Sequence, residues 1–250
     1  MESIDKNDVD ISKLFNYGTP VPLKDDFDKN IKKEDGSPLI LYIKLIGDAD
    51  TNRARVYALR KSSEMRKELR TPDSDLRIAY IPDFTGVSKA NLIEMVINFN
   101  LREYVQEALK SLIMPLPLEP DSGASLEKQE KYQQEVDNWT ETREKRIREL
   151  IEETVVKHRK YLSSLPKEEL ALEAENAIIN ELCEQEMYNS FQSMVLTLGT
   201  FNDPEYTQRS FQTPHGFDNL PKPIRDQLLE AYEKINISTE DLKKLPGVTQ

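Results

Sequence analysis

The chain has 250 residues and a net charge of −11, with 38% hydrophobic and 32% charged residues and a single cysteine, Cys183. An acidic balance excludes bulk affinity for nucleic acid or for an anionic membrane surface, and no stretch approaches the roughly 18 consecutive apolar residues of a membrane span. One cysteine excludes an internal disulfide, and the polar N-terminus does not resemble a signal peptide, so the sequence predicts a soluble cytoplasmic protein.

Residues 1–24 are predicted to form an N-terminal arm, because polar residues predominate before a Pro-containing turn. A short apolar island in this arm comprises Ile11, Leu14, Phe15 and Tyr17. Two interpretations are open. The island docks on the chain's own domain, which we favour, or it binds a partner through Leu14 and Phe15.

Residues 25–114 are predicted to form a small α+β domain. Its main strand covers residues 39–46, which follow a tight-turn signal and are rich in β-branched and aromatic side chains. Both faces of this strand are apolar, so we expect it to be covered on both sides. A weaker strand near Phe27 and Ile31 is expected to precede it in a small hairpin or sheet.

A basic helix is predicted over residues 52–70, where the side chain of Asp50 or Thr51 can accept from the unpaired amides of the first turn. Seven Lys and Arg residues against two Glu residues give this helix a charge of +5. The cations either contact phosphates or an acidic partner, or they are solvated or paired with the acidic stretch 168–186. We favour the second interpretation, because the whole chain is acidic.

One further helix is predicted from Ser88 to about Ile113, and its frequent apolar residues make it the expected core of the small domain. A Pro-rich linker over residues 115–124 follows. Closely spaced prolines remove backbone donors and favour an extended conformation, so we expect this linker to interrupt the helical part of the chain.

A long helical hairpin over residues 125–198 is the most informative feature of the sequence. Ser125 can cap a helix over residues 126–165, Pro166 interrupts the pattern, and a second helix covers residues 167–198. An apolar stripe follows the first helix at three- and four-residue steps. The candidate protein-binding residues of this stripe are Tyr132, Val136, Trp139 and Ile147. The hairpin is expected to close on itself or to associate with a second copy of the chain, as a homo-oligomer.

Residues 199–250 are predicted to form a C-terminal module of short helices, one of them starting at Pro223 and another capped by Ser238. The predicted fold is therefore mainly α, with a small β-hairpin or sheet near the N-terminus and a long antiparallel helical hairpin.

No group of residues in the sequence predicts catalysis. His158 and His215 are the only histidines, and neither belongs to a metal-ligand spacing. His158 sits in the apolar stripe of a helix, as helix-packing residues do. Cys183 lies among glutamates, which disfavour a reactive thiolate. The sequence also lacks glycine-rich phosphate loops and the nucleophile elbow of hydrolases, so we expect no catalytic, metal or cofactor site and no enzyme.

The stretch 35–75 carries an acidic-Gly turn, a strand, the sequence Gly47-Asp48-Ala49-Asp50 and then the basic helix. This order resembles the opening of the tail assembly chaperones of long-tailed bacteriophages, over about the first third of the chain. The resemblance implies a non-enzymatic protein of the infected host's cytoplasm. It would bind the tape-measure protein, keep that long helical chain soluble and help to recruit tail-tube subunits.

Three hypotheses follow from the sequence. The first is an assembly chaperone that covers the apolar stripe of a helical client, with no nucleic-acid or membrane partner. The second is a structural component of a virion neck or tail, bound permanently. The third is an enzyme with carboxylates that converge only in the fold. We favour the first, because amphipathic helices without chemical motifs are typical of binding proteins.

Overall fold

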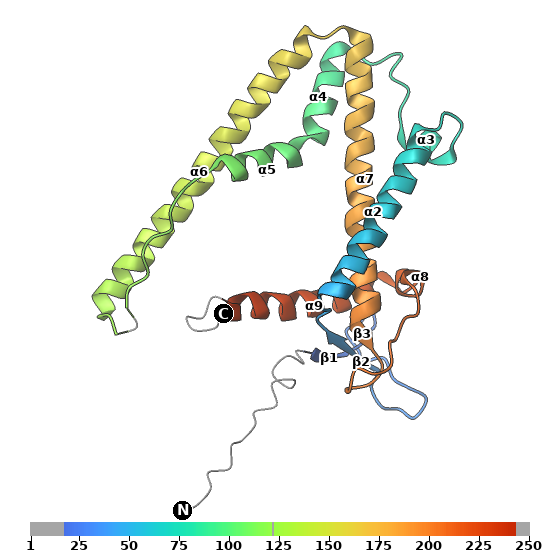
Figure 1. Cartoon of the computed structure of the whole chain (residues 1–250), viewed down its shortest axis with the longest axis vertical. Coiled ribbons are helices and arrows are strands. Elements are labelled where there is room, and N and C mark those ends of the chain that lie inside the picture. The colour runs from blue at the N-terminus through green and yellow to red at the C-terminus, as the bar shows by residue number, and fades with distance from the viewer. Residues whose placement is uncertain (1–17, 122, 244–250) are drawn as a thin grey trace, which may run out of the picture. The chain divides into compact units, whose positions relative to one another are not determined.

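The computed structural model describes residues 18–121 and 123–243, with side chains described as far as Asn236. Eight helices and three short strands occupy these residues, so the prediction of a mainly α fold with a small sheet near the N-terminus is confirmed (Figure 1). The strands are β1 (Gly18–Pro22), β2 (Ile40–Lys44) and β3 (Thr200–Phe201). The helices are α2 (Asp48–Arg70), α3 (Asp75–Tyr80), α4 (Lys89–Phe99), α5 (Leu101–Ser111), α6 (Leu126–Ser164), α7 (Lys167–Gly199), α8 (Pro214–Asp218) and α9 (Lys222–Lys243).

The chain divides into two compact units that are not contiguous in sequence. The first combines the residues up to Met65 with those from Glu184 onward, and the second runs from Arg66 to Cys183. The helices α2 and α7 each pass from one unit into the other. Among the described residues, no helix combines the length and the apolar character needed to cross a bilayer.

The sheet of the first unit has the order β1-β2-β3, with antiparallel neighbours. β2 lies inside the predicted strand 39–46 and buries Leu41 and Ile43. The predicted strand near Phe27 and Ile31 is wrong, because the strand that pairs with β2 is β1. Phe27 instead lies in a turn with 81% of its surface exposed. The two prolines of β1 made this segment look like a turn in the sequence.

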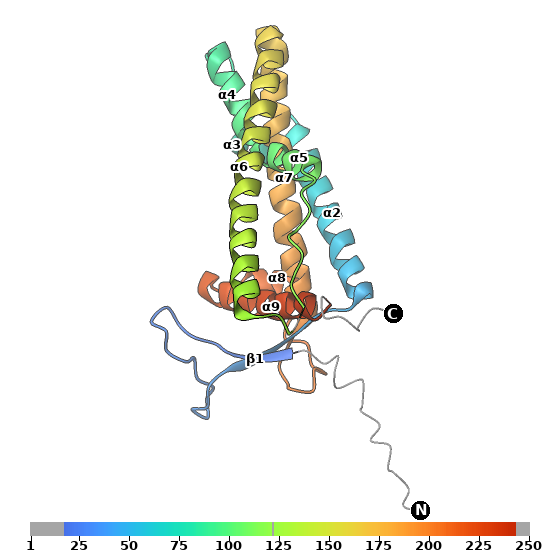
Figure 2. The same ribbon diagram turned by 90° about the vertical axis from the view of Figure 1, so that its left-hand side faces the viewer.

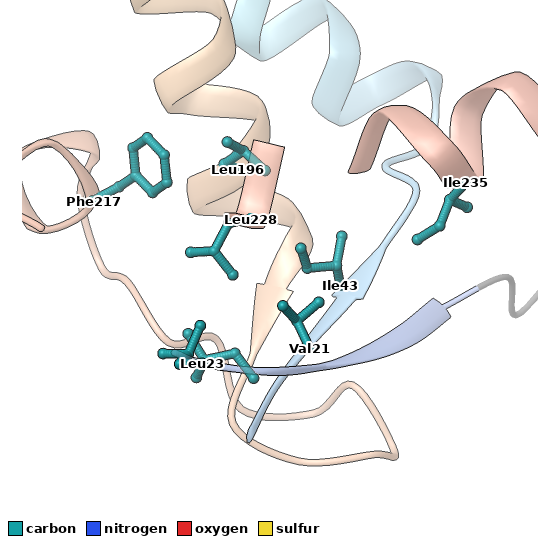
Figure 3. Close-up of a cluster of buried hydrophobic side chains, with 8 residues drawn as sticks. Val21, Leu23, Ile43, Leu196, Phe217, Leu228 and Ile235 are labelled. Carbon is teal, nitrogen blue, oxygen red and sulfur yellow. The ribbon is translucent and has the colours of Figure 1, made fainter. Parts of the chain in front are cut away.

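The core of the first unit lies between the sheet, the end of α7 and the helices α8 and α9. Its buried side chains include Val21, Ile43, Leu196, Phe217 and Leu228 (Figure 3). Ile43 and Leu228 have no exposed surface. Burying such a side chain completely stabilises a fold by about 1.5–3 kcal/mol, so this cluster is what fixes α9 on the sheet.

The second unit is built on α4, the end of α6 and the start of α7. Leu92, Leu162 and Leu170, one from each helix, are fully buried in its core. Polar contacts add to this packing: the Arg159 guanidinium lies 3.0 Å from the carboxylate of Glu94. The core therefore joins the two arms of the hairpin to α4 close to the turn at Pro166.

The prediction of one helix from Ser88 to Ile113 is wrong, because the chain turns at Asn100 and forms α4 and α5. The Ser88 hydroxyl accepts from the Asn91 amide at 3.2 Å, so the predicted start is confirmed. Asn100 is the C-cap residue of α4 and the N-cap residue of α5, and its backbone leaves the helical conformation (φ −95°, ψ 5°). This break turns α5 against α6.

The long helical hairpin is confirmed, with α6 and α7 on either side of Pro166. The helices α4 and α5 pack against α6 (Figure 1, Figure 2). Only Leu162, near its C-terminal end, is fully buried among the 39 residues of α6. Most of the stripe on α6 is therefore only partly covered by the rest of the second unit.

Candidate protein-binding surface

α5 carries apolar residues on two adjacent sides. Tyr104 and Ala108 are buried, with 5% and 2% of their surface exposed. Leu101, Val105 and Leu109 lie beside them at four-residue intervals, and 44%, 37% and 43% of their surfaces are exposed. Residues at this spacing share one face of a helix, so these three form a continuous strip, which we call the α5 ridge.

The chain continues the α5 ridge in an extended segment. Ile113, Leu116 and Leu118 expose 92%, 69% and 93% of their surfaces, and the described residues between α5 and α6 form no helix or strand. The prolines of this segment keep it extended and remove amide donors, as predicted for the linker. Seven of the seventeen large apolar residues that the described chain exposes lie between Leu101 and Leu126, so they are clustered rather than scattered.

The four stripe residues predicted to bind protein, Tyr132, Val136, Trp139 and Ile147, are all partly buried on α6. Two polar members of this stripe, which looked out of place in the sequence, have clear roles. The guanidinium of Arg143 lies over the Trp139 ring at 5.5 Å. His158 Nδ1 and the Tyr104 hydroxyl form a hydrogen bond between α6 and α5.

The contact between Tyr104 and His158 fixes α5 on α6. Their rings meet edge to face at 5.7 Å, and Tyr161 stacks on the other side of His158 at 6.0 Å. Burial raises the pKa of the Tyr104 phenol, so its hydroxyl stays protonated and available for this hydrogen bond at neutral pH. The α5 ridge is thus held in place by side chains on the adjacent, buried side of α5.

Trp139 is less completely packed than its position in the stripe suggests. Its indole N–H is covered, yet it has no acceptor within the described part of the chain. A covered donor without an acceptor costs about 1–3 kcal/mol, so the surroundings of Trp139 are not those of a finished protein interior. The other predicted binding residues, Leu14 and Phe15, lie outside the described residues.

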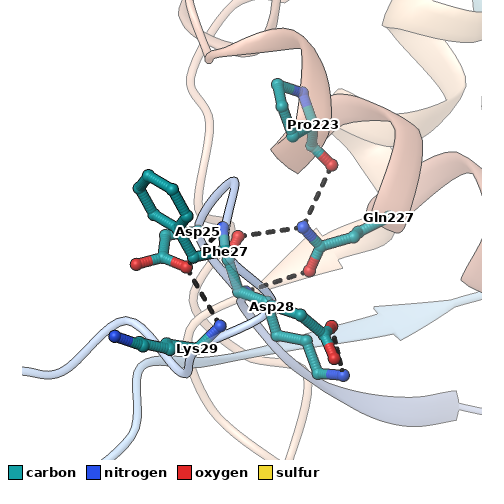
Figure 4. Close-up of polar contacts among 7 residues, drawn as sticks. Asp25, Phe27, Asp28, Lys29, Pro223 and Gln227 are labelled. Carbon is teal, nitrogen blue, oxygen red and sulfur yellow. Dashed lines mark hydrogen bonds and ion pairs between the residues drawn. The ribbon is translucent and has the colours of Figure 1, made fainter.

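The first unit has a groove between β1 and α9. This groove has a volume of about 790 Å³, and Pro22, Asp26, Gln227 and Glu230 are among the residues that line it. The side-chain amide of Gln227 accepts from the Lys24 amide and donates to the Lys24 carbonyl, both at 3.0 Å (Figure 4). Gln227 thereby ties α9 to the backbone of Lys24, just after β1, at the edge of this groove.

Within the part of the chain that the structure describes, no three His, Cys, Asp or Glu side chains come together as a metal site would require. His158 is engaged with Tyr104, and in the first unit His215 Nε2 lies 3.1 Å from the side-chain amide of Asn219, the residue that follows α8. The surface with the clearest binding character is therefore the α5 ridge with its extended continuation.

Comparisons of the chain with protein-family models, with curated proteins and with solved structures found no match.

The α5 ridge was missed by the sequence analysis, which assigned all apolar residues between Ser88 and Ile113 to one buried core. The signal was present in the spacing. Tyr104 and Ala108 mark one side of α5, and Leu101, Val105 and Leu109 extend the apolar arc well beyond what one neighbouring helix can cover.

Proposed function

We propose that this protein is a non-enzymatic assembly chaperone that binds an amphipathic helix of a client protein on the α5 ridge. The observation that carries the proposal is the exposure of Leu101, Val105 and Leu109 on a helix whose other apolar side is already buried. A ridge of this kind offers the counterpart of the anchor residues that a helical client presents at three- and four-residue steps.

The expected strength of binding suits a reversible chaperone. Covering the three ridge residues and the exposed side chains of Ile113, Leu116 and Leu118 would contribute on the order of 5–10 kcal/mol. Lost translational and rotational freedom opposes association by about 4–15 kcal/mol, so only part of this gain remains. The net result is an affinity that allows release, and the acidic surface of the chaperone keeps the complex in solution.

The resemblance of residues 35–75 to phage tail assembly chaperones names the client class. On that basis the client is the tape-measure protein, with tail-tube subunits as a second partner, and the site of action is the cytoplasm of the infected host. The rival function is a permanent component of the virion neck or tail. The two differ in stoichiometry, because a chaperone is absent from purified particles.

The experiment is co-expression with a candidate tape-measure protein, with the soluble amount of that client as the readout. The test variant replaces Leu101, Val105 and Leu109 by Gln, which keeps helix propensity while removing the apolar ridge. The matched control replaces Val156 by Gln, since Val156 is 65% exposed on α6 away from the ridge. We expect the ridge variant to fold but to lose the soluble client, and the control to retain it. Equal client solubility with both variants would refute the ridge as the binding site.

A further inference from the structure

The outward face of α2 in the first unit combines exposed apolar residues with arginines. Val56 and Leu59 expose 66% and 54% of their surfaces, while Ala54 and Ala58 on the opposite side are buried. Around the helix axis, the order of side chains on the exposed face is Arg55, Leu59, Val56, Arg60, from the 100° rotation per residue. Two apolar side chains therefore lie between two cations, and we call these four residues the α2 face.

The two arginines of this face form no ion pair with an acidic residue of another described element. Arg60 pairs with Glu64 of the same helix at 3.0 Å, with 73% of its side chain exposed. Arg55 contacts only the Asn52 side chain among the described residues, at 3.3 Å. Exposed pairs within one helix contribute little to stability, so these arginines are available to an acidic partner. Of the two alternatives favoured from the sequence, exposure to solvent describes these two arginines, and pairing with the acidic stretch 168–186 does not.

The start of α7, in the second unit, has the opposite composition. Leu172 exposes 61% of its surface, and the exposed residues Glu168 and Glu169 flank it from the preceding turn. Within the described chain, neither glutamate has an ion-pair partner. An apolar side chain therefore lies between two free carboxylates, and we call these three residues the α7 face. Its charges and its apolar centre are the complement of the α2 face.

We propose that the α2 face of one molecule binds the α7 face of a second copy of this chain. Leu172 would pack against Val56 and Leu59, while the glutamates approach Arg55 and Arg60. A contact between two different surfaces is heterologous, so it leaves one free face of each kind and adds further copies in an open chain or a closed ring. The inference does not depend on the proposed client or on the α5 ridge.

The contact is small, which sets its expected strength. Two helix faces of two or three turns bury less than the roughly 1,200 Å² of stable complexes, so association is expected to be weak and to need concentrations on the order of 10–100 µM. Charged residues frame both faces, so raising the ionic strength from about 0.05 M to about 0.5 M should weaken association several-fold.

The test is sedimentation velocity of the full-length protein over about 5–500 µM at low ionic strength. Variant one carries Arg55→Glu and Arg60→Glu, variant two carries Glu168→Lys and Glu169→Lys, and variant three carries all four changes. The matched control carries Arg146→Glu and Arg148→Glu on α6, which repeats the charge change of variant one. Circular dichroism of each variant checks that its helices are intact.

We expect the natural protein and the control to self-associate with rising concentration, variants one and two to remain monomeric, and variant three to associate again because both faces have exchanged charge. A mixture of variants one and two should associate again in alternating order, since the α2 face of each variant then carries the opposite charge to the α7 face of the other. A natural protein that stays monomeric over the whole range would overturn the proposal. So would self-association that variants one and two leave unchanged.

Discussion

Replacing Leu162 by Ala should destabilise the second unit strongly, because this residue joins the three helices of its core. Leu162 has no exposed surface and packs in the cluster that contains Leu92 and Leu170. Removing three buried carbon atoms from a tightly packed site costs about 2.7–5 kcal/mol, including the cavity that remains. For a unit of this size, such a loss lowers the melting temperature by roughly 10 °C or more.

The assay can observe the second unit alone. Trp139 is the single tryptophan of the chain and lies in the second unit, so its fluorescence follows the unfolding of that unit, whereas circular dichroism follows both. Val156→Ala provides the control on the same helix, since Val156 is 65% exposed and should cost less than about 0.5 kcal/mol. A loss below about 1 kcal/mol for Leu162→Ala would show that the hairpin end is not the core of the second unit.

Three further predictions test other parts of the structure. Trp139→Ala should cost about 2–3 kcal/mol in urea unfolding, less than for a fully buried tryptophan, because Trp139 is only partly buried. Gly199→Ala should lower the melting temperature of the first unit, measured by circular dichroism, since an added Cβ would lie 2.7 Å from the Lys44 carbonyl of β2. Gly47→Ala is the control, because a Cβ there would meet open space. The backbone amides of Thr207 and Gln208 donate to the Asp203 carboxylate and lower its pKa below the ordinary value of 3.8. The ionised carboxylate therefore stabilises the turn above pH 3.8, and this support is lost as the pH falls through the lowered pKa. An NMR titration should place the Asp203 midpoint below 3.8.

The elements that the sequence predicted well are those in which local signals and packing agree. The Ser88 cap, the strand at 39–46 and the two helices around Pro166 all combine a start or stop signal with a clear apolar period. The errors occur where packing overrides such signals. β1 contains two prolines and resembles a turn, but its core side chain Val21 and its pairing with β2 make it a strand.

The break at Asn100 shows why the binding surface was harder to predict than the fold. Asn100 is a weak helix breaker in a stretch of good apolar period, so the sequence favours a continuous helix. In the structure, α4 packs in the core and α5 turns to contact α6 through Tyr104 and His158. Which apolar residues of α5 become exposed therefore depends on a tertiary contact between residues 54 positions apart, and no local pattern records it.

The separation of core and surface within α5 also decides how the proposed function can be tested. Tyr104 and Ala108 hold the helix in place, whereas Leu101, Val105 and Leu109 contribute exposed area that the folded unit does not use. Substituting the ridge removes only the covered part of each side chain, so each of the three changes should lower the free energy of unfolding by at most about 1 kcal/mol. Apolar side chains that serve only the stability of a fold are usually buried, whereas the ridge residues keep 37–44% of their surface in water. A protein that stays folded with a modest loss of melting temperature but no longer keeps the client soluble would identify a binding ridge. Unfolding of the variant would assign the same three residues to the fold.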